Sequence, residues 1–264
     1  MKKKLLITLG CSYTEGMGCY DFTNFPKDAN VYSKGVTKKQ CDYQFDQFHK
    51  KGWPNKLGKL LGYDKVLNMG LGGSSQSSNM KVFMQKYRNF NFSKYEVFIL
   101  WWIPNSHRFS FYRDRKSFSI ISNSYGDSFD VVDVLGKSYL NFIQLYPEDC
   151  VLETKFYLDL MEDYCEFKGY KLLWVSEEDD YLKKSNISSW LGVSIGDIKA
   201  NLPEHKINPS CFHPNELGYD IISQNIYNTL KQLHPYLIPS IPTTNMEWEW
   251  DGKPIQNNSM AKLI

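Results

Sequence analysis

Short apolar runs alternate with segments of helical spacing along this chain. The four apolar runs are residues 4–9, 65–69, 95–103 and 170–176. The third of them, YEVFILWWI, is apolar almost without interruption, a pattern typical of a strand that is covered on both faces. The segments with helical spacing are residues 53–61, 74–89, 152–168 and 214–233.

Alternating strands and helices favour a parallel sheet with crossover helices. We therefore expect an α/β protein, a three-layer α/β/α sandwich with a mostly parallel, flavodoxin-like doubly wound sheet. Residues 1–234 are interpreted as one domain. Two stretches depart from the alternation and are interpreted as insertions around the site, at about residues 21–51 and 104–147. The second has room for a hairpin.

The last segment, residues 235–264, has little periodicity and is predicted to be an irregular tail. It includes the stretch MEWEWDGKP. We expect this tail to pack along the surface or to contact a partner.

Charge and cysteine content narrow the function classes. Thirty-one basic and twenty-nine acidic residues leave a formal charge of +2, which gives no footprint for nucleic acid or for an anionic membrane. No run approaches the roughly 20 apolar residues of a membrane span, and no signal peptide is evident, so we expect a cytoplasmic protein. The six cysteines lack CxxC spacing, which favours a reducing compartment over a disulfide framework or a zinc site.

Three polar stretches carry candidate chemistry. The first, LGCSYTEG, places Ser12 after the first predicted strand, where a serine is either a nucleophile or a capping residue in a turn. The second, NMGLGGSS, places Gly72 and Gly73 before a helix, where backbone N–H groups bind an anion. The alternatives are a plain turn and a phosphate-binding loop, although the lysine of a Walker loop is missing. The third, CFHPNELGYDII, places His213 before the last helix, as a base or as an ordinary loop residue.

Together these stretches resemble the SGNH hydrolases, also called GDSL esterases and lipases. The family's first block, G-D-S-x-x-x-G, matches GCSYTEG except at Cys11. Its last block, D-x-x-H-P followed by N-x-x-G, matches SCFHPNELG except at Ser210. The third block, G-x-N-D, matches least well, since Asn105 in LWWIPNSHR stands two residues late and has no Gly or Asp beside it.

The resemblance implies a serine esterase that needs no metal or other cofactor. Ser12 attacks the ester, His213 is the base, and the oxyanion is held by the N–H groups of Ser12 and Gly73 and the side chain of Asn105. The substrate is a small-molecule or glycan ester with an acetyl or other short acyl group. Aromatic residues in the loops favour a carbohydrate.

Two points stay open at the level of sequence. Position 210, the family's acid position, holds a serine, so the imidazole is oriented by that position, by a backbone carbonyl, or by Glu177, Glu178 or Glu204. Arg108 and His107 either contact an anionic substrate or lie on a solvated loop. The alternative function is a non-catalytic binding or structural protein that keeps the same fold with a decayed site.

Overall fold

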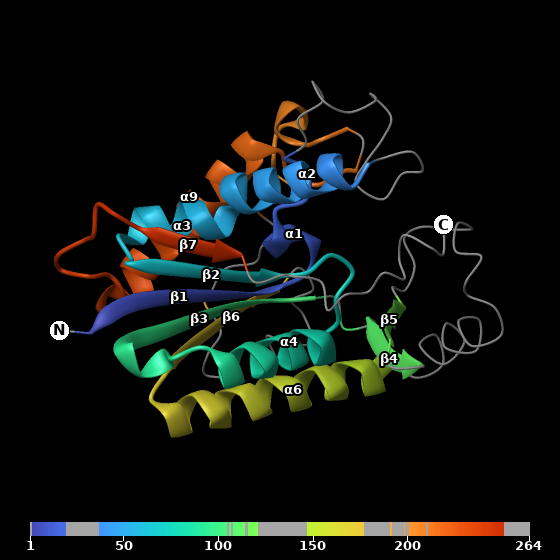
Figure 1. The fold of residues 1–264 in the computed structure, drawn as a ribbon, viewed down its shortest axis with the longest axis horizontal. Coiled ribbons are helices and arrows are strands. Elements are labelled where there is room, and N and C mark those ends of the chain that lie inside the picture. The colour runs from blue at the N-terminus through green and yellow to red at the C-terminus, as the bar shows by residue number, and fades with distance from the viewer. Residues whose placement is uncertain are drawn as a thin grey trace.

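A five-stranded, all-parallel sheet forms the centre of the computed structural model (Figure 1). The structure describes residues 2–19, 37–104, 106, 108–113, 116–120, 147–176, 191, 198, 201–209 and 211–250. The strands lie in the order β6-β3-β1-β2-β7. Their bounds are β1 Lys3–Gly10, β2 Lys65–Gly70, β3 Tyr95–Ile103, β6 Lys171–Ser176 and β7 Glu247–Trp250.

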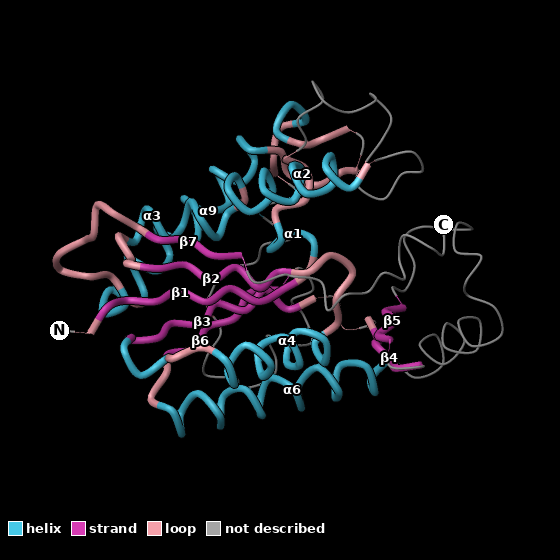
Figure 2. Tube along the Cα trace, in the orientation of Figure 1, coloured by secondary structure: helices cyan, strands magenta, loops and turns pink. Residues whose placement is uncertain are grey.

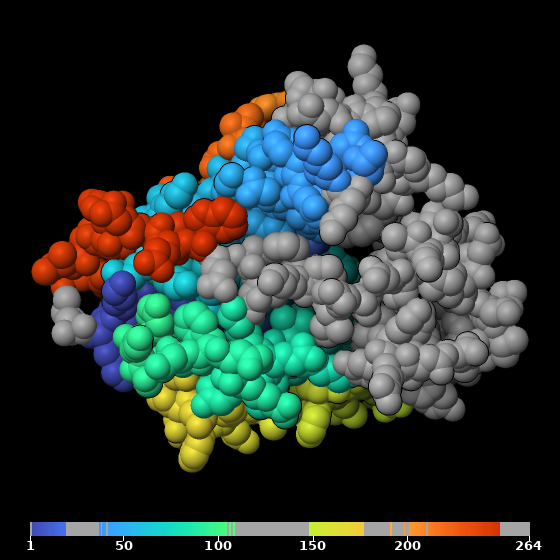
Figure 3. All heavy atoms as spheres, in the orientation of Figure 1, coloured from blue at the N-terminus to red at the C-terminus, as the bar shows by residue number. Residues whose placement is uncertain are grey.

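Helices cover both faces of this sheet, so the molecule has three layers (Figures 1 and 2). Helices α2, α3 and α9 lie on one face, and α4 and α6 lie on the other; the space-filling view shows α2 and the pair α4 and α6 on opposite sides (Figure 3). The helix bounds are α1 Ser12–Glu15, α2 Lys38–Lys51, α3 Trp53–Leu61, α4 Gln76–Asn89, α6 Pro147–Lys168 and α9 Glu216–Leu233. Short 3-10 turns are η2 Phe92–Lys94, η3 Glu204–Lys206 and η4 Pro235–Leu237.

The uninterrupted apolar run of β3 is explained by burial on both faces. Side chains alternate along a strand, so Leu100 and Trp102 join the core beneath α3 and α9. Ile99 and Trp101 join the second core, beneath α4 and α6. The fold class expected from the sequence is confirmed.

The order of the strands creates a topological switch point at β1. β1 lies between β2 and β3 and pairs in parallel with both. The chain therefore reverses direction across the sheet at β1, and in open α/β sheets ligands bind outside the carboxyl ends at such a point. The first four strands of the sheet follow the flavodoxin-like order, and β7 adds to the edge beside β2.

Two elements were absent from the sequence expectations. Strand β7 lies in the tail that we predicted to be irregular, because the four residues EWEW are too short to separate a strand from coil by pattern alone. Helix α2 lies in the first insertion. Its N-terminus is a capping box between Thr37 and Gln40, a signal that the sequence carried.

The second insertion contains the hairpin that the sequence left room for. Strands β4 Phe109–Arg113 and β5 Lys116–Ile120 pair antiparallel, outside the main sheet. The division of the chain into one domain and a tail stays a prediction. Within the described part of the chain, no helix is both long and apolar enough to cross a bilayer.

Candidate active site

The turn that carries Ser12 is fixed by close packing at the end of β1. Gly10 has φ 151°, and a Cβ there would collide with the Thr14 side chain and the Trp102 carbonyl. Cys11 then begins the single-turn helix α1, of which Ser12 is the first residue. Cys11 is only 2 % exposed and packs into the core, so the thiol beside Ser12 is a packing group.

The loop that carries His213 is closed at its base. Ile207 and Pro214 form an isolated β-bridge, and the Asn208 N–H donates to the His213 carbonyl at 2.8 Å. The Asn208 side chain also donates to the Gly18 carbonyl at 2.8 Å, which ties this loop to the chain just after α1. A Cβ on Gly18 would collide with the Pro214 carbonyl. The chain just after α1 therefore packs backbone to backbone against the loop that carries His213.

These two turns bring Ser12 and His213 into direct contact. The distance between Ser12 Oγ and His213 Nε2 is 2.8 Å, a hydrogen-bond length for a serine and its base. The other ring nitrogen, Nδ1, lies 2.8 Å from the carbonyl oxygen of Cys211. A carbonyl only accepts, so Nδ1 carries the proton and Nε2 is left to accept the Ser12 hydroxyl proton.

Aromatic stacking sets the plane of the imidazole. The Tyr13 ring lies 4.6 Å from the His213 ring, and on its other side it stacks on Trp102 of β3 at 5.1 Å and 12°. Trp102 is fully buried. Sequence reasoning missed Tyr13 and Trp102 as supports of the site, because no motif marks contacts between residues so far apart in the chain.

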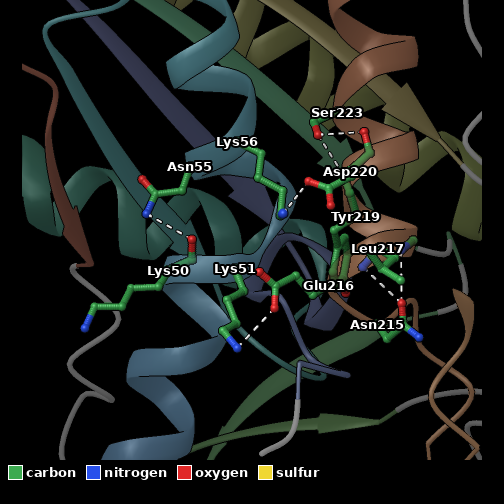
Figure 4. Close-up of polar contacts among 11 residues, drawn as sticks. Lys50, Lys51, Asn55, Lys56, Asn215, Glu216, Leu217, Tyr219, Asp220 and Ser223 are labelled. Carbon is green, nitrogen blue, oxygen red and sulfur yellow. Dashed lines mark hydrogen bonds and ion pairs between the residues drawn. The ribbon is translucent and has the colours of Figure 1, made fainter. Parts of the chain in front are cut away.

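The start of α9 is anchored next to His213. Asn215 caps the helix by accepting from the N–H groups of Leu217 and Gly218 (Figure 4). Two ion pairs join the first turns of α9 to neighbouring helices (Figure 4). Lys51 of α2 pairs with Glu216 at 3.1 Å, and Lys56 of α3 pairs with Asp220. These contacts hold the base against the helical layer.

The glycine-rich turn after β2 is linked to the Ser12 turn at several points. The Gly10 carbonyl accepts from the N–H of Leu71 at 3.0 Å and from Ser74 Oγ at 2.9 Å. The Gly72 N–H donates to Glu15 Oε2 at 3.0 Å. Gly73, with φ 72°, lies between these linked residues.

Two of the expected oxyanion donors, the N–H groups of Ser12 and Gly73, have no acceptor in the described part of the protein. Among the described residues, no hydrogen bond uses the backbone N–H of Ser12 or of Gly73. Both groups follow adjacent parallel strands, β1 and β2, at the same edge of the sheet. This arrangement leaves two donors for an anionic oxygen near the serine.

Glu15 is an unexpected buried carboxyl group on the same turn as Ser12. It is 1 % exposed, and burial raises its pKa from 4.5 to about 8, although the Gly72 N–H acts in the opposite direction. Glu15 is therefore largely protonated at pH 7. No pattern in the sequence indicates this burial.

The remaining predicted residues divide into those the structure places and those it does not describe. Arg108 lies next to the glycine-rich turn, with Nη1 3.5 Å from the Ser74 carbonyl. Glu204 is exposed on η3 and makes no hydrogen bond to His213. Outside the described residues lie Asn105, His107, Glu177, Glu178 and Ser210.

No metal centre emerges from the described ranges, which contain no group of three or more His, Cys, Asp or Glu side chains that could hold an ion. The parallel sheet and the Ser–His pair at its carboxyl edge thus define an α/β/α protein with the parts of a serine-dependent site. Comparisons of the chain with protein-family models, with curated proteins and with solved structures gave no significant match.

Proposed function

We propose that this protein is a carboxylic ester hydrolase with Ser12 as nucleophile and His213 as general base. The observation that carries the proposal is the 2.8 Å contact between Ser12 Oγ and His213 Nε2, with Nδ1 bound by the Cys211 carbonyl. A serine hydroxyl is a weak nucleophile until an oriented base accepts its proton.

The proposed reaction is acyl transfer in two steps. Ser12 Oγ attacks the ester carbonyl while His213 takes its proton, and the imidazolium then gives that proton to the leaving alcohol. Water, activated by the same imidazole, hydrolyses the acyl-enzyme and regenerates Ser12. The N–H groups of Ser12 and Gly73 are the proposed donors to the oxyanion of each tetrahedral intermediate.

The proposed substrate is a small molecule or glycan ester with a short acyl group, and the proposed location is the cytoplasm. The buried thiols of Cys11, Cys19 and Cys165 support a reducing compartment. The low exposure of Ser12, 7 %, supports a short acyl chain.

The test combines covalent labelling with kinetics. We expect a fluorophosphonate probe to label wild type and not Ser12→Ala. We expect Ser12→Ala and His213→Ala each to lower kcat on a short-chain aryl ester by at least about 10³-fold. The double variant should be hardly slower, because residues acting as one unit are not additive.

Matched controls come from the same residue types outside the site. Ser93→Ala, at the amino end of β3, and His234→Ala, at the far end of α9, should keep wild-type rates. Loss of activity in Cys11→Ala with activity retained in Ser12→Ala would assign the nucleophile to the thiol. A folded wild type that neither labels nor hydrolyses esters would instead favour a non-catalytic binding protein on this fold.

A further inference from the structure

Arg108 lies beside the proposed oxyanion turn and is only half-buried. Its Nη1 is 3.5 Å from the carbonyl of Ser74, the residue that follows Gly73. Ser74 is in turn bonded through Oγ to the Gly10 carbonyl, two residues before Ser12. A short chain of contacts therefore connects this guanidinium to the nucleophile's turn.

Among the described residues, little of the hydrogen-bonding capacity of Arg108 is used. A guanidinium has five N–H donors, and the long contact to Ser74 is the one hydrogen bond it makes in the part of the chain that the structure describes. Its Nε is buried and has no acceptor in the described ranges of the chain. A buried donor of a charged group without a partner is costly, and an anion that accepts from the guanidinium removes this cost.

In the part of the chain that the structure describes, no carboxylate neutralises the charge of Arg108. Arg108 forms no ion pair with a described carboxylate, whereas Lys51 and Lys56 are each paired with acidic residues of α9. The acidic residue on the Ser12 turn, Glu15, accepts from the Gly72 N–H and is largely neutral at pH 7.

We propose that Arg108 binds an anionic group of the ester substrate, a carboxylate or a phosphate, and so determines substrate class. This inference rests on the proposed esterase function and restricts the proposed substrates. The ester carries a negative charge a few bonds from the scissile carbonyl. The planar guanidinium suits such groups because it donates two parallel hydrogen bonds to them.

The test compares neutral and anionic esters in matched variants. On the acyl side, anionic mono-4-nitrophenyl succinate is compared with neutral 4-nitrophenyl acetate. On the alcohol side, anionic 4-acetoxybenzoate is compared with neutral 4-acetoxybenzamide. We expect kcat/KM of wild type to be about 10- to 100-fold higher for an anionic ester than for its neutral match. Arg108→Gln should bring this ratio close to one, mainly through KM, and Arg108→Lys should retain part of it.

Arg88→Gln is the control, because Arg88 lies at the other end of α4, roughly 18 Å along the helix from Gln76. It should keep the wild-type ratio. Equal losses on both esters in Arg108→Gln would mean that Arg108 only supports the glycine-rich turn, and would overturn the proposal. A wild type with no preference for either anionic ester would overturn it as well.

A binding measurement separates this inference from the proposed function. Succinate and inorganic phosphate are titrated into Ser12→Ala and into Ser12→Ala with Arg108→Gln, by calorimetry. At least tenfold weaker binding of one anion in the double variant supports the anion site even if no ester is hydrolysed, and shows which anion it prefers. Equal or undetectable binding in both proteins refutes it.

Discussion

Phe212 adopts a backbone conformation that side chains rarely tolerate, directly before the proposed base. Its φ is 57°, and among the described residues it is the one non-glycine position with positive φ. Its side chain is 66 % exposed, so little packing energy compensates for the conformation. For an L-residue the left-handed region costs roughly 1–2 kcal/mol. The loop therefore stores strain next to His213, as functional loops often do.

Substitutions at Phe212 should reveal this strain. We expect the free energy of unfolding of Phe212→Gly to lie within about 1 kcal/mol of the wild-type value, because glycine adopts positive φ without a steric penalty. Phe212→Val should be less stable than Phe212→Gly by about 1–2 kcal/mol, since a β-branched residue fits this region worst. Urea unfolding measures both.

The same pair of substitutions at Phe156 provides the control. Phe156 is 60 % exposed in the middle of α6, where glycine is a poorer helix former than valine. The order of stabilities should therefore reverse there. Phe212→Val as stable as Phe212→Gly would show that position 212 is unstrained.

At the residue scale, the sequence motifs indicated Ser12 and His213 as a pair, and their contact confirms that the two lie together, while their catalytic roles stay a prediction. The group that orients the imidazole was left open between three alternatives. The structure places the Cys211 carbonyl at Nδ1. Every residue has a backbone carbonyl, so no sequence pattern marks the one that orients the imidazole.

At the element scale, Glu15 joins helix α1 to the glycine-rich turn through Gly72. Its pKa is near 8 in the folded protein and near 4.5 when exposed, so the folded state holds this proton more tightly than the unfolded state. The corresponding stability is fully present below pH 4.5 and is lost as the pH rises through 8.

Glu15→Gln should remove this pH dependence, because an amide oxygen still accepts from Gly72 and never ionises. We expect the two proteins to have similar free energies of unfolding at pH 5. At pH 9 the variant should be more stable by a few kcal/mol. Urea unfolding at pH 5, 7 and 9 measures this difference. Glu204→Gln, at an exposed position, should follow the wild-type profile. If the free energy of unfolding of Glu15→Gln changed with pH in the same way as that of wild type, this would contradict the burial of a neutral carboxyl group.

Elements with a clear apolar pattern were predicted close to their observed bounds, whereas α2 and β7 were missed. Strand β3 matches its expected residues because its apolar run is continuous, and helix α3 does so because its apolar residues follow helical spacing. Helix α2 is mostly polar, and its core contact is made through isolated residues such as Phe48. Strand β7 owes its existence to the free edge of β2, a tertiary cause that a local pattern does not carry.

At the scale of the whole molecule, β7 closes one edge of the sheet. Residues 247–250 pair in parallel with residues 65–68 of β2. The segment before it is also attached, since the Thr243 N–H donates to the Gly62 carbonyl at 2.9 Å. Without β7, strand β2 would present an open edge, which invites pairing with other chains.

Deleting residues 245–264 should therefore destabilise the protein and promote association. We expect a loss of about 2–4 kcal/mol in the free energy of unfolding, from the lost ladder hydrogen bonds at roughly 1 kcal/mol each. The apparent mass in size-exclusion chromatography should rise with concentration, more than for the full chain. Deleting residues 251–264 alone is the control. A shortened protein with unchanged stability and mass would show that β7 adds nothing to the sheet.

The hydrogen bond between Ser12 and His213 joins residues 201 positions apart. At a synthesis rate of roughly 5–20 residues per second, Ser12 leaves the ribosome about 10–40 s before the imidazole that contacts it has been made. During that interval the Ser12 hydroxyl has no His213 imidazole beside it, even if the early strands have already paired. The nascent chain thus lacks the contact between Ser12 and His213 until the loop that carries His213 has been synthesised and has docked.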